Sequence, residues 1–98
     1  MLTIRETDVF SGWMSALRDP RGKAKIAARS DRLAQGNPGD VAPVGGGVSE
    51  MRIHFGPGYR VYYTKQDDEV VILLCGGDKA TQGRDIKRAI KLKTNLEG

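Results

Sequence analysis

The sequence contains a single cysteine, a single histidine and no long apolar run. Cys75 cannot form an internal disulfide and has no second thiol for a metal site, so a disulfide-stapled domain is excluded. The longest apolar run, residues 70–75, is far too short to cross a bilayer, and residues 1–7 lack the apolar stretch of a secretory signal. We therefore expect a cytoplasmic protein that has no membrane contact and carries Cys75 in its core.

The length of 98 residues fits one domain, spanning residues 1–98, with a modest core. Its net charge of +4 is unevenly distributed. Residues 18–32 carry six basic and two acidic side chains, and residues 79–93 carry six basic and one acidic, whereas residues 36–78 carry three basic and six acidic. The two basic segments are either solvated helix faces or an electrostatic footprint for a polyanion.

Residues 48–76 contain three strand-like runs. Alternation of apolar and polar side chains predicts two half-buried strands, and the unbroken apolar run at 70–75 predicts a strand covered on both faces. A Gly-Pro-Gly corner at 56–58 joins the first two strands, and residues 66–68 join the last two. If the apolar faces of the first two strands coincide, four side chains share the opposite face, where we expect function: Arg52, His54, Arg60 and Tyr62.

The flanking segments are predicted to form one short strand and three helices. Residues 2–6 alternate like a strand, and Thr7 is a suitable N-cap for a helix whose apolar face includes Phe10 and Trp13. Asp19 followed by Pro20 starts a second helix. Residues 36–47 form a Gly- and Pro-rich connection, and its run of three glycines at 45–47 is not a phosphate loop because no Lys-Ser/Thr pair follows. Thr81 is expected to cap the last helix.

The predicted order is thus β-α-α-β-β-β-α, an α+β fold with a small antiparallel sheet, an N-terminal helical hairpin and a C-terminal helix. This order, combined with the stretches SEMR at 49–52, GYRVYY at 58–63 and LLCGGDK at 73–79, resembles the RelE/ParE toxin superfamily. The similarity is greatest to its HigB-like, phage-related branch of addiction-module killer proteins, and it covers essentially the whole chain.

The resemblance implies the toxin of a type II toxin–antitoxin system, neutralised by a cognate antitoxin that in this branch is commonly a helix-turn-helix protein. Operator DNA would be reached only through that antitoxin. Most members of the superfamily inhibit translation as endoribonucleases that cleave mRNA on the ribosome, without metal or other cofactor, whereas the ParE side poisons DNA gyrase. A degenerate toxin that only docks to its antitoxin and operator is the third alternative.

RNA cleavage by the adjacent 2′-hydroxyl requires a base, cations on the phosphate and an acid for the leaving oxygen. The predicted catalytic residues are Arg60 and Arg52 as phosphate clamps and His54 as base or acid. Each has a structural alternative: a salt bridge to Glu50 or another acid for the arginines, and a packing role for His54. The predicted RNA-binding residues are Tyr62, which equally well packs at an edge, together with Lys79, Arg84 and Lys87.

One departure from the superfamily concerns the C-terminus. Many members place a catalytic His or Tyr there, but residues 93–98 contain neither. If the chain cleaves RNA, His54 or a cluster of basic residues must therefore supply the chemistry.

Overall fold

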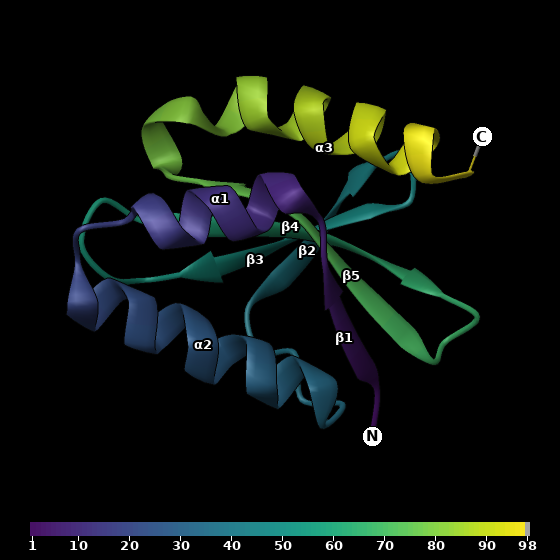
Figure 1. Cartoon of the computed structure of the whole chain (residues 1–98), viewed down its shortest axis with the longest axis horizontal. Coiled ribbons are helices and arrows are strands. Elements are labelled where there is room, and N and C mark those ends of the chain that lie inside the picture. Colours follow the sequence, from purple (N-terminus) through teal and green to yellow (C-terminus); the bar gives the residue numbers. More distant parts are fainter. Residues whose placement is uncertain (98) are drawn as a thin grey trace.

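In the computed structural model, which describes residues 1–97, one five-stranded sheet has helices on both faces (Figure 1). The strand order is β1-β5-β4-β3-β2, in which β1 pairs with β5 in parallel and all other neighbours are antiparallel. The elements are β1 (Thr3–Glu6), α1 (Asp8–Ala16), α2 (Pro20–Ala34), β2 (Val41–Gly45), β3 (Val48–Ile53), β4 (Tyr59–Gln66), β5 (Val70–Gly77), a short 3₁₀ turn η1 (Lys79–Thr81) and α3 (Gln82–Glu97).

The predicted α+β fold and the order of its predicted elements are confirmed, with one strand added. Residues 36–47, expected to be a connection, contain β2, which pairs with β3 as an edge strand. Pro43 is tolerated there because an edge strand leaves one row of backbone donors unused. The density of Gly and Pro in this segment concealed the short apolar run that forms the strand.

The helix starts follow local capping rules. The Thr7 hydroxyl accepts the backbone N–H of Phe10, and the Asp19 carboxylate accepts that of Gly22 with Pro20 in the first turn. The last helix differs from expectation. Asp78, rather than Thr81, caps the turn η1 that leads into α3, and its carboxylate accepts the N–H groups of Ala80 and Thr81.

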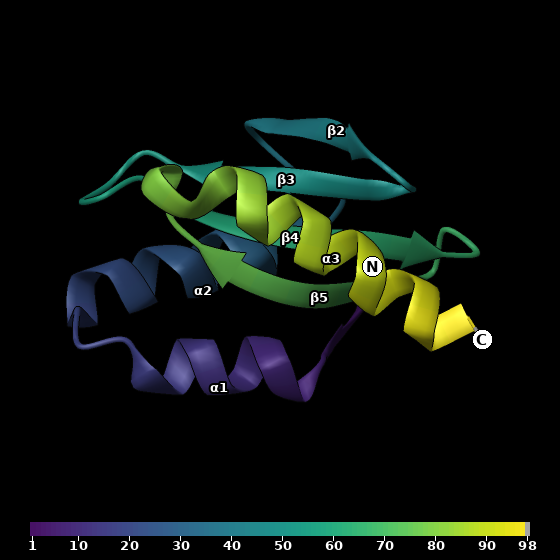
Figure 2. The same ribbon diagram turned by 90° about the horizontal axis from the view of Figure 1, so that it is seen from above.

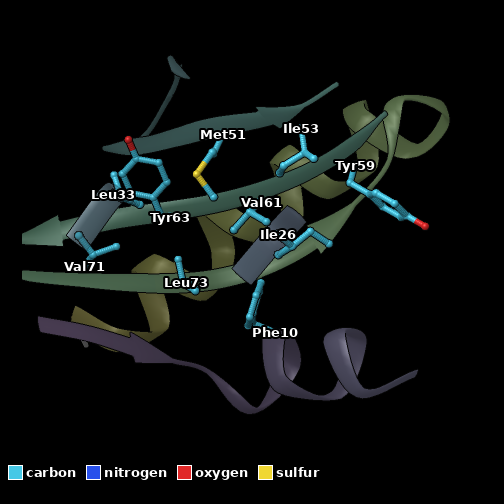
Figure 3. Close-up of a cluster of buried hydrophobic side chains, with 10 residues drawn as sticks. All are labelled: Phe10, Ile26, Leu33, Met51, Ile53, Tyr59, Val61, Tyr63, Val71 and Leu73. Atoms are coloured by element: carbon cyan, nitrogen blue, oxygen red, sulfur yellow. The ribbon is translucent and has the colours of Figure 1, made fainter. Parts of the chain in front are cut away.

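The sheet separates two apolar clusters. On one face, the larger cluster lies between the strands and α1 and α2, where side chains of β3, β4 and β5 point toward Phe10, Ile26 and Leu33 (Figure 3). On the other face, α3 runs across the strands (Figure 2) and buries Tyr62, Leu74 and Cys75 beneath Ala89. As predicted, β5 is covered on both faces and Cys75 is buried, and burial raises the pKa of its thiol to about 11.

No helix among residues 1–97 has both the length and the apolar character needed to cross a bilayer.

The end of β5 brings helices on both faces close to the backbone. A Cβ added at Gly76 would overlap the Trp13 ring of α1, and one added at Gly77 would overlap the Asp85 carboxylate of α3. Two consecutive residues without side chains therefore allow the two helical layers to approach the same strand end.

We expect Gly76→Ala to lower the free energy of unfolding by about 1–3 kcal/mol, because the added methyl group displaces a packed indole ring. Gly12→Ala is the control: Gly12 lies within α1 and nothing would contact its added Cβ within 4 Å. Removing a helical glycine there should stabilise the protein by about 0.5–1 kcal/mol. Urea unfolding of both variants tests the prediction, and equal stability of the two would contradict it.

Candidate functional site

The candidate site lies at one end of the molecule. In both ribbon views the β3–β4 corner and the N-terminal ends of α2 and α3 lie at the same end of the sheet (Figures 1 and 2). The corner is the predicted Gly-Pro-Gly reversal, in which Gly56 and Gly58 both have positive φ. Two helix N-termini pointing to one end add their partial positive charges to those of the side chains there.

The corner is fixed to the start of α2 by one carboxylate. The Tyr59 hydroxyl donates to Asp19 at 2.8 Å, and Asp19 also accepts the backbone N–H of Gly22 at 3.0 Å. These hydrogen bonds, first that of Gly22, lower the pKa of Asp19, while the bond to Asp19 raises the pKa of Tyr59. Arg21 and Lys25 of α2 lie over the Phe55 ring, at 5.9 and 5.1 Å from its centroid.

The predicted shared face exists for three of its four residues, Arg52, Arg60 and Tyr62, and it is only partly accessible. His54 departs from the prediction, because it lies beyond the end of β3 and borders α2. Arg52 pairs with Arg60 and Glu50 pairs with Tyr62 across β3 and β4, so these side chains lie on the same side of the sheet. That side is covered by α3, and Tyr62 is completely buried. The prediction that Tyr62 contacts RNA is not compatible with this burial, which also strongly raises the pKa of its hydroxyl.

Glu50 is the centre of the polar network under α3. It is fully buried and accepts hydrogen bonds from Nε of Arg52 at 2.9 Å, the Tyr62 hydroxyl at 3.3 Å and Nε2 of Gln82 at 2.6 Å. Three donors compensate the desolvation of a buried carboxylate. The network ties the first turn of α3 to the sheet and fixes the direction of Arg52.

Arg60 occupies the same face without forming the ion pair considered as its structural alternative. Only 9% of the residue is exposed, and its Nε is buried with no hydrogen-bond partner among residues 1–97. Arg60 therefore contributes an uncompensated positive charge close to Arg52, but its burial limits direct contact with a ligand.

His54 and Arg52 are the accessible members of the predicted site, and both contact Asp40. Nε2 of His54 lies 2.5 Å from the Asp40 carboxylate, and Nη1 of Arg52 lies 3.5 Å from it. The His54 side chain is 73% exposed and that of Arg52 36% exposed. The hydrogen bond from His54, followed by the charge of Arg52, lowers the pKa of Asp40. His54 thus has one nitrogen fixed by a carboxylate and the other open to solvent.

Arg29 of α2 holds Asp40 in place through the backbone. Its guanidinium donates to the carbonyls of Arg52 at 2.6 Å, Pro38 at 3.1 Å and Asp40 at 3.4 Å. Sequence reasoning identified neither Arg29 nor Asp40 as site residues. Asp40 lies in the Gly- and Pro-rich segment, where no periodic pattern gives a side chain's direction, and its contacts are with residues 11 to 14 positions away.

A groove of about 400 Å³ lies between α2 and the end of β3, with His54 on its rim. Ala24, Ala28 and Ile53 supply apolar surface, and Lys25, Arg29 and Arg32 supply positive charge. No acidic residue among those described lines it. The basic segment at 18–32 therefore faces a hollow next to the histidine.

The remaining predicted RNA-binding residues are exposed but do not line this groove. Lys79 lies beside Gly58 of the corner, where a Cβ added to the glycine would be 3.3 Å from Cβ of Lys79. Arg84 and Lys87 lie on the exposed side of α3, across the sheet from α2. Over residues 1–97, no three His, Cys, Asp or Glu side chains converge to hold a metal ion.

Comparison with known proteins gives three similarities. The model of the family described as phage-derived protein Gp49-like (DUF891) matches residues 13–96. A protein of uncharacterised function from Haemophilus influenzae is 50% identical over 95 residues, which cover 97% of this chain and 96% of the relative. A chain in the crystal structure of the toxin–antitoxin complex RelBE2 from Mycobacterium tuberculosis superposes with a TM-score of 0.64 at 22% identity, covering 80% of this chain and 98% of the other.

The contact between His54 and Asp40 can be tested by NMR titration of the aspartate side-chain carboxyl carbons. We expect the pKa of Asp40 to lie below the ordinary value of an aspartate and to rise toward that value in His54→Ala, because its main hydrogen-bond donor is lost. Asp19 is the internal control, since its pKa is lowered by Gly22 and Tyr59 and should not change. An Asp40 pKa that is identical in both proteins would contradict the contact.

Proposed function

The chain belongs to the phage-derived Gp49-like family, and from this premise we propose that it is the toxin of a type II toxin–antitoxin system that inhibits translation by cleaving mRNA. The RelE-like fold supports the proposal. The observation that carries it is the contact of His54 with Asp40, beside Arg52 and on the rim of a cationic groove. An imidazole, a guanidinium and a cationic surface thus lie close together, which supports roles for them as base, phosphate-binding cation and polyanion surface.

His54 is the proposed proton carrier. With the Asp40 carboxylate ionised, Nε2 of His54 carries the proton that it donates, so Nδ1 is left as an acceptor for the proton of the ribose 2′-hydroxyl. The 2′-oxygen then attacks phosphorus, and the bond to the 5′-oxygen breaks. The imidazolium, stabilised by Asp40, can return its proton to the leaving 5′-oxygen.

Arginine supplies the charge that this reaction needs. Arg52 is fixed through Nε and Nη1, which leaves Nη2 for a phosphate oxygen and restricts the motion of the guanidinium. Arg60, one strand away and unpaired, adds positive potential beneath the same phosphate. Lys79, beside the corner, is the proposed third cation.

The proposed partners are a cognate antitoxin, expected to carry a helix-turn-helix, and the ribosome that presents the mRNA. Operator DNA would be contacted only through the antitoxin. The cationic groove and the exposed face of α3, with Arg84 and Lys87, are separate positive surfaces on opposite sides of the sheet. One protein of this size can therefore contact a substrate strand and a second polyanionic surface at once.

In a cleavage assay with translating ribosomes, His54→Gln should lower the rate by about 10²–10⁴-fold, the range for loss of a general base. Asp40→Asn should also lower it, because an amide cannot stabilise the imidazolium. Lys65→Gln is the control, since Lys65 is exposed on β4 and lies outside the site. Full activity of His54→Gln would rule out its proposed role.

Substitution of the cations gives a second test. Arg52→Ala should lose roughly 3 kcal/mol of transition-state stabilisation, by analogy with one charge-stabilising donor. The variant also removes one of the three donors to the buried Glu50, so circular dichroism must show that it is folded under the assay conditions. Full activity of the folded variant would contradict the proposed role of Arg52.

Mapping mRNA 5′ ends after induction of the chain without its partner separates the alternatives. Growth arrest with intact mRNA and altered supercoiling, unaffected by Arg52→Ala and His54→Gln, would indicate a gyrase-directed toxin. Unimpaired growth would indicate a module that only binds its antitoxin.

A further inference from the structure

We infer that the groove between α2 and β3 holds one unpaired nucleotide of the substrate RNA, next to the phosphate on which His54 acts. The inference rests on the proposed function and specifies how the substrate is bound. Its basis is the combination of an apolar floor, a wall of three cations and a histidine on the rim.

The shape of the groove follows from two small residues. Ala24 and Ala28 lie one turn apart on the same side of α2, and neither side chain extends beyond a methyl group. Ile53, which is 3% exposed, closes the floor from the end of β3. The resulting volume of about 400 Å³ is in the range of small-ligand sites, roughly 300–1,000 Å³.

The positive charge of the groove favours an anionic ligand. Lys25 and Arg32 form no ion pair with any side chain of residues 1–96. Arg29 donates only to backbone carbonyls, although its charge is one of those that lower the pKa of Asp40. With Arg32 and Lys25 seven positions apart, cations line about two turns of the helix beside the floor. This spacing suits successive phosphates of a strand better than one isolated carboxylate.

An aromatic ring lies beside the groove without lining it. Phe55 follows His54 directly, is half-buried, and lies under Arg21 and Lys25. Aromatic surface next to cations is the usual composition of single-strand binding sites, in which bases stack and phosphates pair with positive charge. Lys25 borders both the ring and the groove, so positive charge is available to the phosphate of a base held there.

The apolar floor also limits how the groove can distinguish one base from another. The side chains of Ala24, Ala28 and Ile53 have no hydrogen-bonding groups, so they cannot read the edge of a base. We therefore expect these three residues to discriminate only by the size of the base, purine against pyrimidine, and any recognition of a base edge to come from the cations and His54.

The test introduces larger side chains on α2 that fill the groove. Ala28→Leu and Ala24→Leu place a branched side chain in it, and Ala27→Leu is the matched control: Ala27 is equally exposed and adjacent, but it lines a different crevice with Ile4 and Glu6. All three positions are exposed in a helix, where leucine is well accepted. Affinity for short single-stranded oligoribonucleotides is measured in a His54→Gln background, and cleavage is measured in the otherwise unchanged chain.

We expect both groove-filling variants to bind RNA about tenfold or more weakly, as for the loss of one stacked base, and Ala27→Leu to bind normally. If the unsubstituted chain cleaves RNA but the groove-filling variants match Ala27→Leu in affinity and rate, the inference is wrong and the proposed function stands. If the chain neither binds nor cleaves RNA, both are wrong. Normal RNA cleavage with loss of neutralisation by the antitoxin would assign the groove to a protein partner instead.

Discussion

The arrangement of the site depends on one buried carboxylate. Glu50 lies on β3, next to the edge strand β2, has no exposed surface, and accepts hydrogen bonds from Arg52, Tyr62 and Gln82. Arg52 belongs to the same strand, Tyr62 to the neighbouring strand β4 and Gln82 to α3. The same carboxylate therefore fixes both the position of the helix on the sheet and the direction of the arginine. An unpaired buried carboxylate is costly, which means that the three contacts are maintained together or lost together. The direction of Arg52 is therefore coupled to the packing of a helix on the opposite side from the groove.

A second set of constraints positions the histidine. His54 follows the last residue of β3, and neither the strand nor the turn alone fixes its ring. The ring is oriented by Asp40, whose backbone is held by Arg29, while the corner beyond it is tied to α2 through Tyr59 and Asp19. Helix α2 thus supplies both the groove and the contacts that place the histidine at its rim. Charge and geometry therefore come from one element of the fold.

Local patterns in the sequence were sufficient for most of the fold. Alternation predicted β3 and β4 and correctly placed Arg52, Arg60 and Tyr62 on one face, and capping chemistry located the starts of α1 and α2. The periodicity of the sequence does not indicate which helix covers which face of the sheet. Tyr62 and Arg60 are buried because α3 packs on their face of the sheet. The contact joins β4 to a helix some 20 to 30 residues later in the sequence. Asp40 was missed for a related reason: a residue in a segment rich in Gly and Pro has no period, and its partners can be recognised only in three dimensions. The edge strand β2 was concealed by the same composition.

The parallel pairing of the first strand with the last has a consequence for how the chain is made. Residues 3–6 have no partner until residues 70–73 exist, so the sheet cannot close on a partly synthesised molecule. The carboxylate that orients Arg52 likewise receives its third hydrogen bond only from residue 82. A growing chain consequently carries its positive charges in an unassembled state until residue 82 has been made. The site is completed only when α3 can pack on the sheet.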